Sequence, residues 1–161
     1  MSDDYFTTQL TGTACAPRNC AAASGAMALA DAGGPRLTAD QFRGQSGSSC
    51  VPGAHSASGG LFISDVERVI RANGQDIDYG RDANGSPRRW KPADFTSRLP
   101  AEGAVLLGDY DALWATYRAS ATFLGDHSVY VHDYRTVGDN VCWHDPLRRV
   151  PIRIPASAAI A

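Results

Sequence analysis

The sequence predicts a single α+β domain over residues 1–161, because helix signals fill its first half and strand signals its second. A chain of 161 residues is long enough to bury a sizeable core. Its 43% hydrophobic and 20% charged residues are ordinary for a globular protein. No repeat or linker divides it. Because the strand signals follow the helix signals, we expect an antiparallel sheet rather than an alternating parallel one.

Four helices are predicted from their start and stop signals. The run CAAASGAMALADA from Cys20 to Ala32 is rich in helix formers, has Asn19 at its N-cap position and ends at Gly33-Gly34. The other three starts are marked by two capping-box pairs and a proline, at Thr38 with Gln41, Ser64 with Glu67, and Pro92. We expect the last helix to end near Leu99 and the Gly/Ser-rich residues 44–60 to form a long loop.

Strand signals occur at four places in the second half, at residues 104–107, 127–135, 140–147 and 151–155. The two central segments are separated by Thr136 to Asp139, a turn sequence typical of a hairpin. The last segment, PIRIP, has proline at both ends and therefore predicts an edge strand.

Charge and hydropathy argue against several classes of partner. A net charge of −2 and a pI near 6.0 do not attract nucleic acid or a membrane surface. No run approaches the roughly 18 apolar residues of a membrane span, and the N-terminal MSDDYFTTQL lacks the features of a signal peptide. We expect a protein that is made in the cytoplasm without a signal peptide and binds neither nucleic acid nor membrane.

Cys20 lies at the predicted start of a helix, where a thiol becomes a good nucleophile. The N–H groups and the dipole of a helix N-terminus lower the pKa of a thiol. The small residues Ala21, Ala22 and Ala23 leave room for a substrate. The backbone N–H of Cys20 is available there for an oxyanion hole. We predict that Cys20 is the nucleophile and the one cysteine whose thiolate is populated near neutral pH.

The predicted hairpin carries a histidine and a carboxylate on one face. Because side chains alternate along a strand, His127 shares a face with Asp133, and Asp145 shares a face with Trp143. With the turn centred near Gly138, His127 and Asp145 come within about two residues of cross-strand register, which is diagonal reach. A histidine oriented by a carboxylate is the base that nucleophilic catalysis needs.

These segments resemble papain-like cysteine peptidases, most closely the leader-peptide-processing domains of bacteriocin transporters. The motifs are NCAAASGAMAL with Cys20, DHSVYVHDY with His127, and WHDPL with Asp145. They also resemble peptidase domains in lysins and tail proteins of phages that infect actinobacteria. The resemblance implies a papain-like fold, in which an N-terminal helix bearing the nucleophile packs on a C-terminal antiparallel sheet. It further implies that Cys20 is the nucleophile, His127 the base and Asp145 the orienting residue.

One position departs from the family pattern. These families carry a glutamine about six residues before the cysteine as a second oxyanion donor. That position is Ala14 here, and the nearest glutamine, Gln9, requires an inserted turn. We assign Gln9 to this role by resemblance.

The resemblance also implies a substrate and a place of action. We expect a peptidoglycan endopeptidase of a phage lysin or virion tail, whose partners are the stem peptide and other tail or lysin domains. Such an enzyme acts at the bacterial cell wall or as part of the virion, and release by a holin or delivery by a tail needs no signal peptide. The alternative within the class is a peptidase that matures a leader peptide or a phage structural protein.

Two further alternatives belong to other classes. Cys15, Cys20, Cys50 and His55 would supply four zinc ligands, but their spacing is loose for a zinc knuckle and leaves His127 without a role. A catalytically inactive binding domain on the same fold would explain the missing glutamine. On the peptidase interpretation we expect no cofactor and no metal.

The remaining cysteines and histidines are given structural roles. Cys142, His132 and His144 fall on the hairpin face opposite Asp145, and we interpret Cys142 as a packing residue. Cys15 and Cys50 either form a disulfide or stay as thiols.

We also expect an open groove between the two halves, partly walled by the loop of residues 44–60. Trp90, Tyr110 and Trp114 are predicted to lie at its rim.

Overall fold

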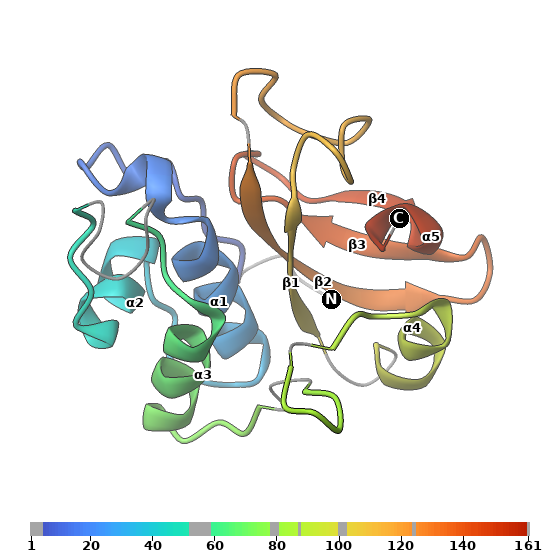
Figure 1. Cartoon of the computed structure of the whole chain (residues 1–161), viewed down its shortest axis with the longest axis horizontal. Coiled ribbons are helices and arrows are strands. Elements are labelled where there is room, and N and C mark those ends of the chain that lie inside the picture. The colour runs from blue at the N-terminus through green and yellow to red at the C-terminus, as the bar shows by residue number, and fades with distance from the viewer. Residues whose placement is uncertain are drawn as a thin grey trace.

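The computed structural model describes residues 5–51, 59–77, 81–86, 88–99, 103–123 and 125–160. Three helices lie together on one side of the molecule: α1 (Cys20–Asp31), α2 (Ala39–Ser46) and α3 (Ile63–Ala72) (Figure 1). A short 3-10 helix, η1 (Ala16–Arg18), leads into α1. The helices α4 (Pro92–Arg98) and α5 (Ala156–Ala159) lie beside the sheet. The predicted α+β class is confirmed. No helix in these ranges is long and apolar enough to cross a bilayer.

The sheet has four antiparallel strands, β1 (Ala104–Asp109), β2 (Asp126–Arg135), β3 (Asn140–His144) and β4 (Ile152–Pro155), in the order β1-β2-β3-β4. All four predicted strands are present, and the predicted turn of residues 136–139 joins β2 to β3. Opposite residues are Tyr130 with His144 and Val131 with Trp143. This register decides which side chains share a face of the hairpin.

The predicted start of α2 is confirmed, whereas that of α3 is shifted. The capping box of α2 forms as expected, since Gln41 N–H donates to Thr38 Oγ1 over 3.2 Å. Helix α3, however, begins at Ile63 rather than after Ser64. There the Asp65 side chain accepts a hydrogen bond of 3.1 Å from the Phe62 N–H, while Phe62 has no side-chain acceptor, so only one half of a capping box forms.

The Gly/Ser-rich region is only partly a loop. Helix α2 continues to Ser46 and ends where Gly47 adopts a left-handed conformation with φ of 70°, which glycine tolerates without strain. The predicted loop therefore begins after Ser46. Residues 52–58, including His55, lie outside the described residues, and they include part of the loop predicted to wall a groove between the halves.

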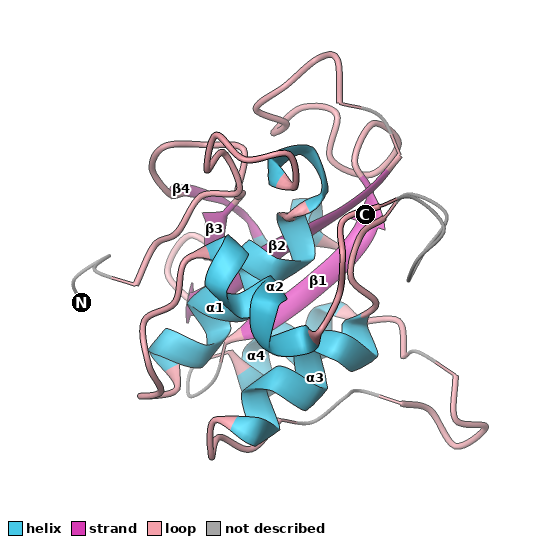
Figure 2. Cartoon of the chain, turned by 90° about the vertical axis from the view of Figure 1, so that its left-hand side faces the viewer, coloured by secondary structure: helices cyan, strands magenta, loops and turns pink. Residues whose placement is uncertain are grey.

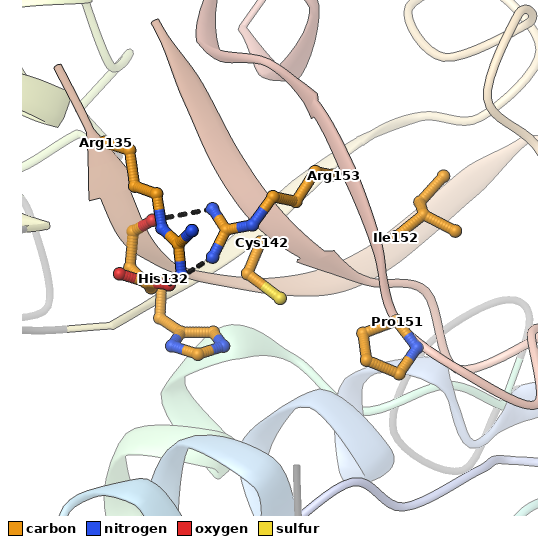
Figure 3. A pocket seen from close by; sticks show the side chains of 7 residues that line it. His132, Arg135, Cys142, Pro151, Ile152 and Arg153 are labelled. Atoms are coloured by element: carbon orange, nitrogen blue, oxygen red, sulfur yellow. Dashed lines mark hydrogen bonds and ion pairs between the residues drawn. The ribbon is translucent and has the colours of Figure 1, made fainter. Parts of the chain in front are cut away.

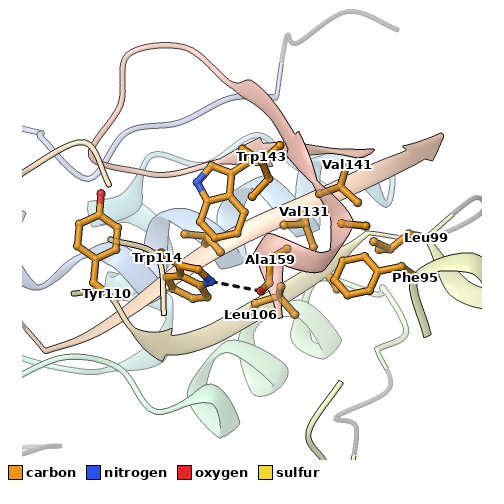
Figure 4. Packing of buried hydrophobic residues seen from close by; sticks show 13 residues of the cluster. Phe95, Leu99, Leu106, Tyr110, Trp114, Val131, Val141, Trp143 and Ala159 are labelled. Carbon is orange, nitrogen blue, oxygen red and sulfur yellow. Dashed lines mark hydrogen bonds between the residues drawn. The ribbon is translucent and has the colours of Figure 1, made fainter. Parts of the chain in front are cut away.

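The described residues form two apolar cores, one on a face of the sheet and one among the N-terminal helices. Val129, Val131 and Trp143 pack with residues of α4, α5 and the segment after β1, where Trp114 Nε1 donates to the Ala159 carbonyl over 3.2 Å (Figure 4). On the other face, α1 lies across β1 and β2 (Figure 2), and the Tyr130 hydroxyl of β2 donates to Asp31 of α1. The second core lies among α1, α2 and α3 and is built on alanines of α1, Phe42 and Val66.

A disulfide joins Cys15, just before η1, to Cys50, after α2. It therefore ties the approach to Cys20 to the far end of α2, and it decides between the two possibilities left open by the sequence. Closing a loop over a separation of 35 residues lowers the entropy of the unfolded chain and contributes roughly 3–4 kcal/mol.

We expect the double variant Cys15→Ser/Cys50→Ser to melt roughly 7–14 °C below the parent protein, because the unfolded chain regains the lost entropy. Calorimetry with and without reductant measures this. The reductant should lower the melting temperature of the parent protein and leave that of the double variant unchanged. An equal melting temperature for the oxidised and reduced parent would contradict the predicted contribution.

Candidate active site

Cys20 is the first residue of α1 and is partly exposed. Asn19 occupies the N-cap position as predicted, but its side chain makes no cap. Its amide instead donates to Asp40 over 2.7 Å and accepts from the Arg43 guanidinium over 2.5 Å. The side chain that would have bound the N–H groups of the first turn thus points elsewhere, and α1 presents its positive end at Cys20.

His127 and Asp145 meet as the hairpin register predicts. Tyr130 opposes His144, so His127 and Asp145 lie two positions apart across the strands. His127 Nε2 is 2.9 Å from Asp145 Oδ1, and both side chains have an exposed fraction of 0%. A buried pair of this kind holds the imidazole ring in one orientation and one tautomer.

Asp145 is held by further hydrogen bonds. Its Oδ1 also accepts from the Leu147 N–H over 2.8 Å, and its Oδ2 accepts from the Tyr110 hydroxyl. Burial raises the pKa of the carboxyl, but these donors and His127 outweigh that effect and hold the pKa below its usual range. The carboxylate therefore stays charged beside the imidazole.

His127 interacts with the candidate nucleophile, Cys20, as well as with Asp145. Burial alone would lower the pKa of His127, but interactions with Asp145 and with the Cys20 thiol raise it to about 9. Nδ1 makes no hydrogen bond of good geometry within the described ranges, while Nε2 is occupied by Asp145. Because Asp145 occupies Nε2, Nδ1 is the nitrogen left to exchange a proton with the thiol.

Aromatic rings pack around the imidazole. The ring of Tyr110 lies 4.3 Å from that of His127 between centroids, and the ring of Phe123 lies 5.1 Å away. The prediction that Tyr110 and Trp114 line a groove rim is wrong, because their exposed fractions are 0% and 2%. Trp90 is half-buried against Phe95 of α4 and the same core. Sequence analysis missed Tyr110 as a partner of Asp145, since 35 positions separate them.

Asp133 does not share the environment of His127, although strand alternation predicted a common face. The pairing of β2 with β3 is irregular between His132 and Arg135, and Asp133 has a positive φ of 49°. Its carboxylate pairs with Arg135 and Arg153. The irregularity turns this side chain away and removes it from the candidate site.

Gln9 is fully buried at the junction of the two halves. Its side-chain Nε2 donates to the Ala16 carbonyl over 3.1 Å, and its backbone N–H donates to the Pro146 carbonyl over 3.1 Å. It therefore bridges the turn before Cys20 and the residue after Asp145. An amide nitrogen has two hydrogens, so Nε2 retains one for a further acceptor. The role of Gln9 as oxyanion donor stays a prediction.

Arg43 is a buried cation behind the nucleophile, and sequence analysis missed it. Its guanidinium donates to the Asn19 side chain and to the carbonyls of Arg18 and Gly59, over 2.5, 2.5 and 3.1 Å. Burial lowers the pKa of Arg43, and the charge of Cys20 opposes this. Arg43 thus holds the Arg18-Asn19 turn and adds positive potential near Cys20. Arg43 lies inside the helix predicted to follow Thr38, and nothing in the local sequence indicates that it binds the Arg18-Asn19 turn.

The zinc set proposed as an alternative does not form. Cys15 and Cys50 are bonded to each other and are not available as thiolate ligands. His55 lies outside the described residues. The structure therefore contradicts this ligand set and leaves Cys20 as the candidate nucleophile.

No protein-family model matches this chain, and no curated protein matches it either. The candidate site therefore stands on its geometry: a thiol at a helix N-terminus, an imidazole beside it and a buried carboxylate behind the imidazole.

We expect iodoacetamide at pH 6.5 to label Cys20 first, because His127 has a pKa of about 9 and stays protonated beside the thiol. The variant His127→Ala should label at Cys20 roughly tenfold more slowly. Mass spectrometry of peptides measures both rates. Faster labelling of Cys142, or an unchanged rate in His127→Ala, would contradict the assignment.

We expect Arg43→Lys to lower the free energy of unfolding by about 1–3 kcal/mol, because lysine cannot donate to all the acceptors that the guanidinium reaches. It should also slow labelling of Cys20 in the folded protein, since the Arg18-Asn19 turn loosens. The exposed Arg36→Lys is the control and should change stability by less than about 0.5 kcal/mol. Equal stability for the two variants would show that Arg43 does not hold the turn.

Proposed function

We propose that this protein is a papain-like cysteine peptidase that hydrolyses amide bonds with Cys20 as nucleophile, His127 as base and Asp145 as orienting residue. The observation that carries the proposal is the fully buried His127–Asp145 pair, whose imidazole interacts with a thiol at a helix N-terminus. A histidine that only filled a core position would not need both a buried carboxylate and a partly exposed thiol. Nucleophilic catalysis needs both.

In the first step the thiolate of Cys20 attacks the carbonyl carbon of the substrate. The carbonyl oxygen becomes negatively charged in the tetrahedral intermediate. The backbone N–H of Cys20 and the second hydrogen of Gln9 Nε2 donate to it. His127 Nδ1 then gives its proton to the leaving amine, and the C–N bond breaks to leave an acyl group on Cys20.

In the second step a water molecule gives a proton to His127 Nδ1 and attacks the thioester carbon. The C–S bond breaks, the acid product leaves, and the thiolate–imidazolium pair returns. Asp145 keeps Nε2 engaged throughout, so Nδ1 stays the exchanging nitrogen. Because the leaving amine needs a proton from His127, activity should fall as the pH rises through about 9.

We assign the substrate to the peptide part of peptidoglycan, by the resemblance of the three motifs to peptidase domains of phage lysins and tail proteins. The Cys15–Cys50 disulfide supports a site of action outside the reducing cytoplasm. The cell wall, reached during lysis or from a virion tail, meets that condition.

A suspension of actinobacterial cell walls tests the proposal, with release of free amino groups as the measure of amide hydrolysis. The parent protein should release them, and Cys20→Ala should not. Release from leader or capsid-protein peptides, without release from cell walls, would keep the peptidase and replace the substrate. The peptidase assignment would be wrong if the protein, folded and with Cys20 as a free thiol, hydrolysed neither substrate.

His127 and Asp145 should contribute unequally to the rate. His127→Ala removes the proton donor and the thiolate partner together, so turnover should become unmeasurable. Asp145→Asn keeps the shape and can still accept a hydrogen bond from Nε2, so it should retain some activity, and Asp145→Ala should retain less. Circular dichroism checks that the variants fold. Full activity of a folded Asp145→Ala protein would exclude Asp145 from the mechanism.

A further inference from the structure

Three side chains that could ligate a metal meet on the other face of the β2–β3 hairpin. His132 of β2 directly opposes Cys142 of β3, and His144 is two residues further along β3, so all three project to one side. His144 Nε2 lies 2.7 Å from His132 Nε2 and 3.3 Å from Cys142 Sγ. All three side chains are buried. Cys142 is buried, as expected of a packing residue, and its sulfur also contacts a ring nitrogen.

We propose that His132, Cys142 and His144 form a zinc-binding site, with the Tyr5 hydroxyl beside its fourth position. The three donor atoms lie within 4.8 Å of one another, which one ion can span. This site is distinct from the candidate active site and does not depend on the proposed peptidase activity. A zinc site here differs from the expectation of a metal-free protein. That expectation was based only on the possible ligand set of Cys15, Cys20, Cys50 and His55.

The donor types fit zinc, and the donor distances lie near those that zinc needs. Zinc prefers thiolate and imidazole ligands, and bond lengths of about 2.0–2.3 Å place tetrahedral donors roughly 3.3–3.7 Å apart. The sulfur already lies 3.3 Å from His144 Nε2. The two ring nitrogens, 2.7 Å apart, need to separate by roughly 0.6 Å, which small side-chain rotations provide.

The Tyr5 hydroxyl is within hydrogen-bonding distance of His132 Nε2, the nitrogen that faces His144. The Tyr5 ring also packs against both histidines, with centroids 5.3 and 5.5 Å away. The hydroxyl is therefore placed either to ligate the ion or to orient a water molecule on it. Ion binding would join the segment that leads to Gln9 to the strand that leads to Asp145.

A route of access for the ion exists. A pocket of about 270 Å³ is lined by His132 and Cys142, and Figure 3 shows both side chains on the same side of the sheet. The basic residues of its wall, Arg135 and Arg153, both pair with Asp133, which reduces their repulsion of a cation. A thiolate at Cys142 also lowers the local positive charge when the ion arrives.

The test uses the full chain carrying Cys20→Ala, which removes the other thiol outside the disulfide. After treatment with chelator, the protein is titrated with Zn²⁺ and, separately, with Co²⁺ as a spectroscopic probe. We expect about one ion per chain, a thiolate-to-cobalt charge-transfer band, and a melting temperature roughly 5–10 °C higher at zinc concentrations a hundredfold above the dissociation constant.

Two variants and one protection measurement locate the site. Cys142→Ala in the same background should abolish the band, while Tyr130→Phe, a change of a non-ligand on the same face, should keep it. Zn²⁺ should also slow alkylation of Cys142 at least tenfold in the protein with all three ligands, a measurement that remains valid if Cys142→Ala does not fold.

Absence of the band together with unchanged alkylation of Cys142 in the folded protein would overturn the proposal. A band that persists in Cys142→Ala would overturn it as well. Under either outcome, the three residues form only a hydrogen-bonded cluster, with His144 Nε2 as the shared acceptor.

Discussion

The buried pair of His127 and Asp145 is the interaction on which the rest of the candidate site depends. An ionised group away from water is costly unless its partners are held in place, and here both side chains have an exposed fraction of 0%. The hairpin register brings the two together, and the Tyr110 hydroxyl and Leu147 N–H fill the remaining positions around the carboxylate. The core around Trp114 and Trp143 then keeps Tyr110 where the carboxylate needs it.

The candidate nucleophile, Cys20, is held by a different set of constraints. Cys20 lies at the start of a helix whose buried residues are mostly small, with alanines, Ser24 and Gly25 among them, so α1 packs closely on its neighbours and has little freedom to shift. Arg43 and the Cys15–Cys50 disulfide hold the turn just before it. Gln9 connects this turn to Pro146, next to Asp145. The site thus lies where two separately stabilised halves meet, and a few polar contacts determine their alignment.

Patterns local in sequence predicted much of this arrangement. Strand alternation and the turn near Gly138 were enough to predict that His127 and Asp145 meet, because hairpin geometry depends on only about twenty consecutive residues. Helix signals predicted α1 and α2 for the same reason. The failures involve partners far apart in sequence. Asn19 has the residue type of a cap, yet Asp40 and Arg43 bind its side chain instead. Tyr110 and Trp114 looked like rim residues because nothing local indicates burial, and Asp133 was misplaced because alternation does not reveal an irregular pairing.

The same hairpin register that brings His127 and Asp145 together also forms the cluster on its other face. Alternation sends His127 and Asp145 to one side, so His132, Cys142 and His144 must share the opposite side. His144 is adjacent to Asp145 in the chain, and a residue whose side chain is held on one face limits the movement of its neighbour on the other. An ion bound by His132, Cys142 and His144 would therefore stiffen the backbone that carries Asp145 without touching the substrate. The contact of Tyr5 with His132 extends this constraint along the chain toward Gln9. One bound ion would therefore restrict the movement of both Asp145 and Gln9, the proposed orienting residue and the proposed oxyanion donor.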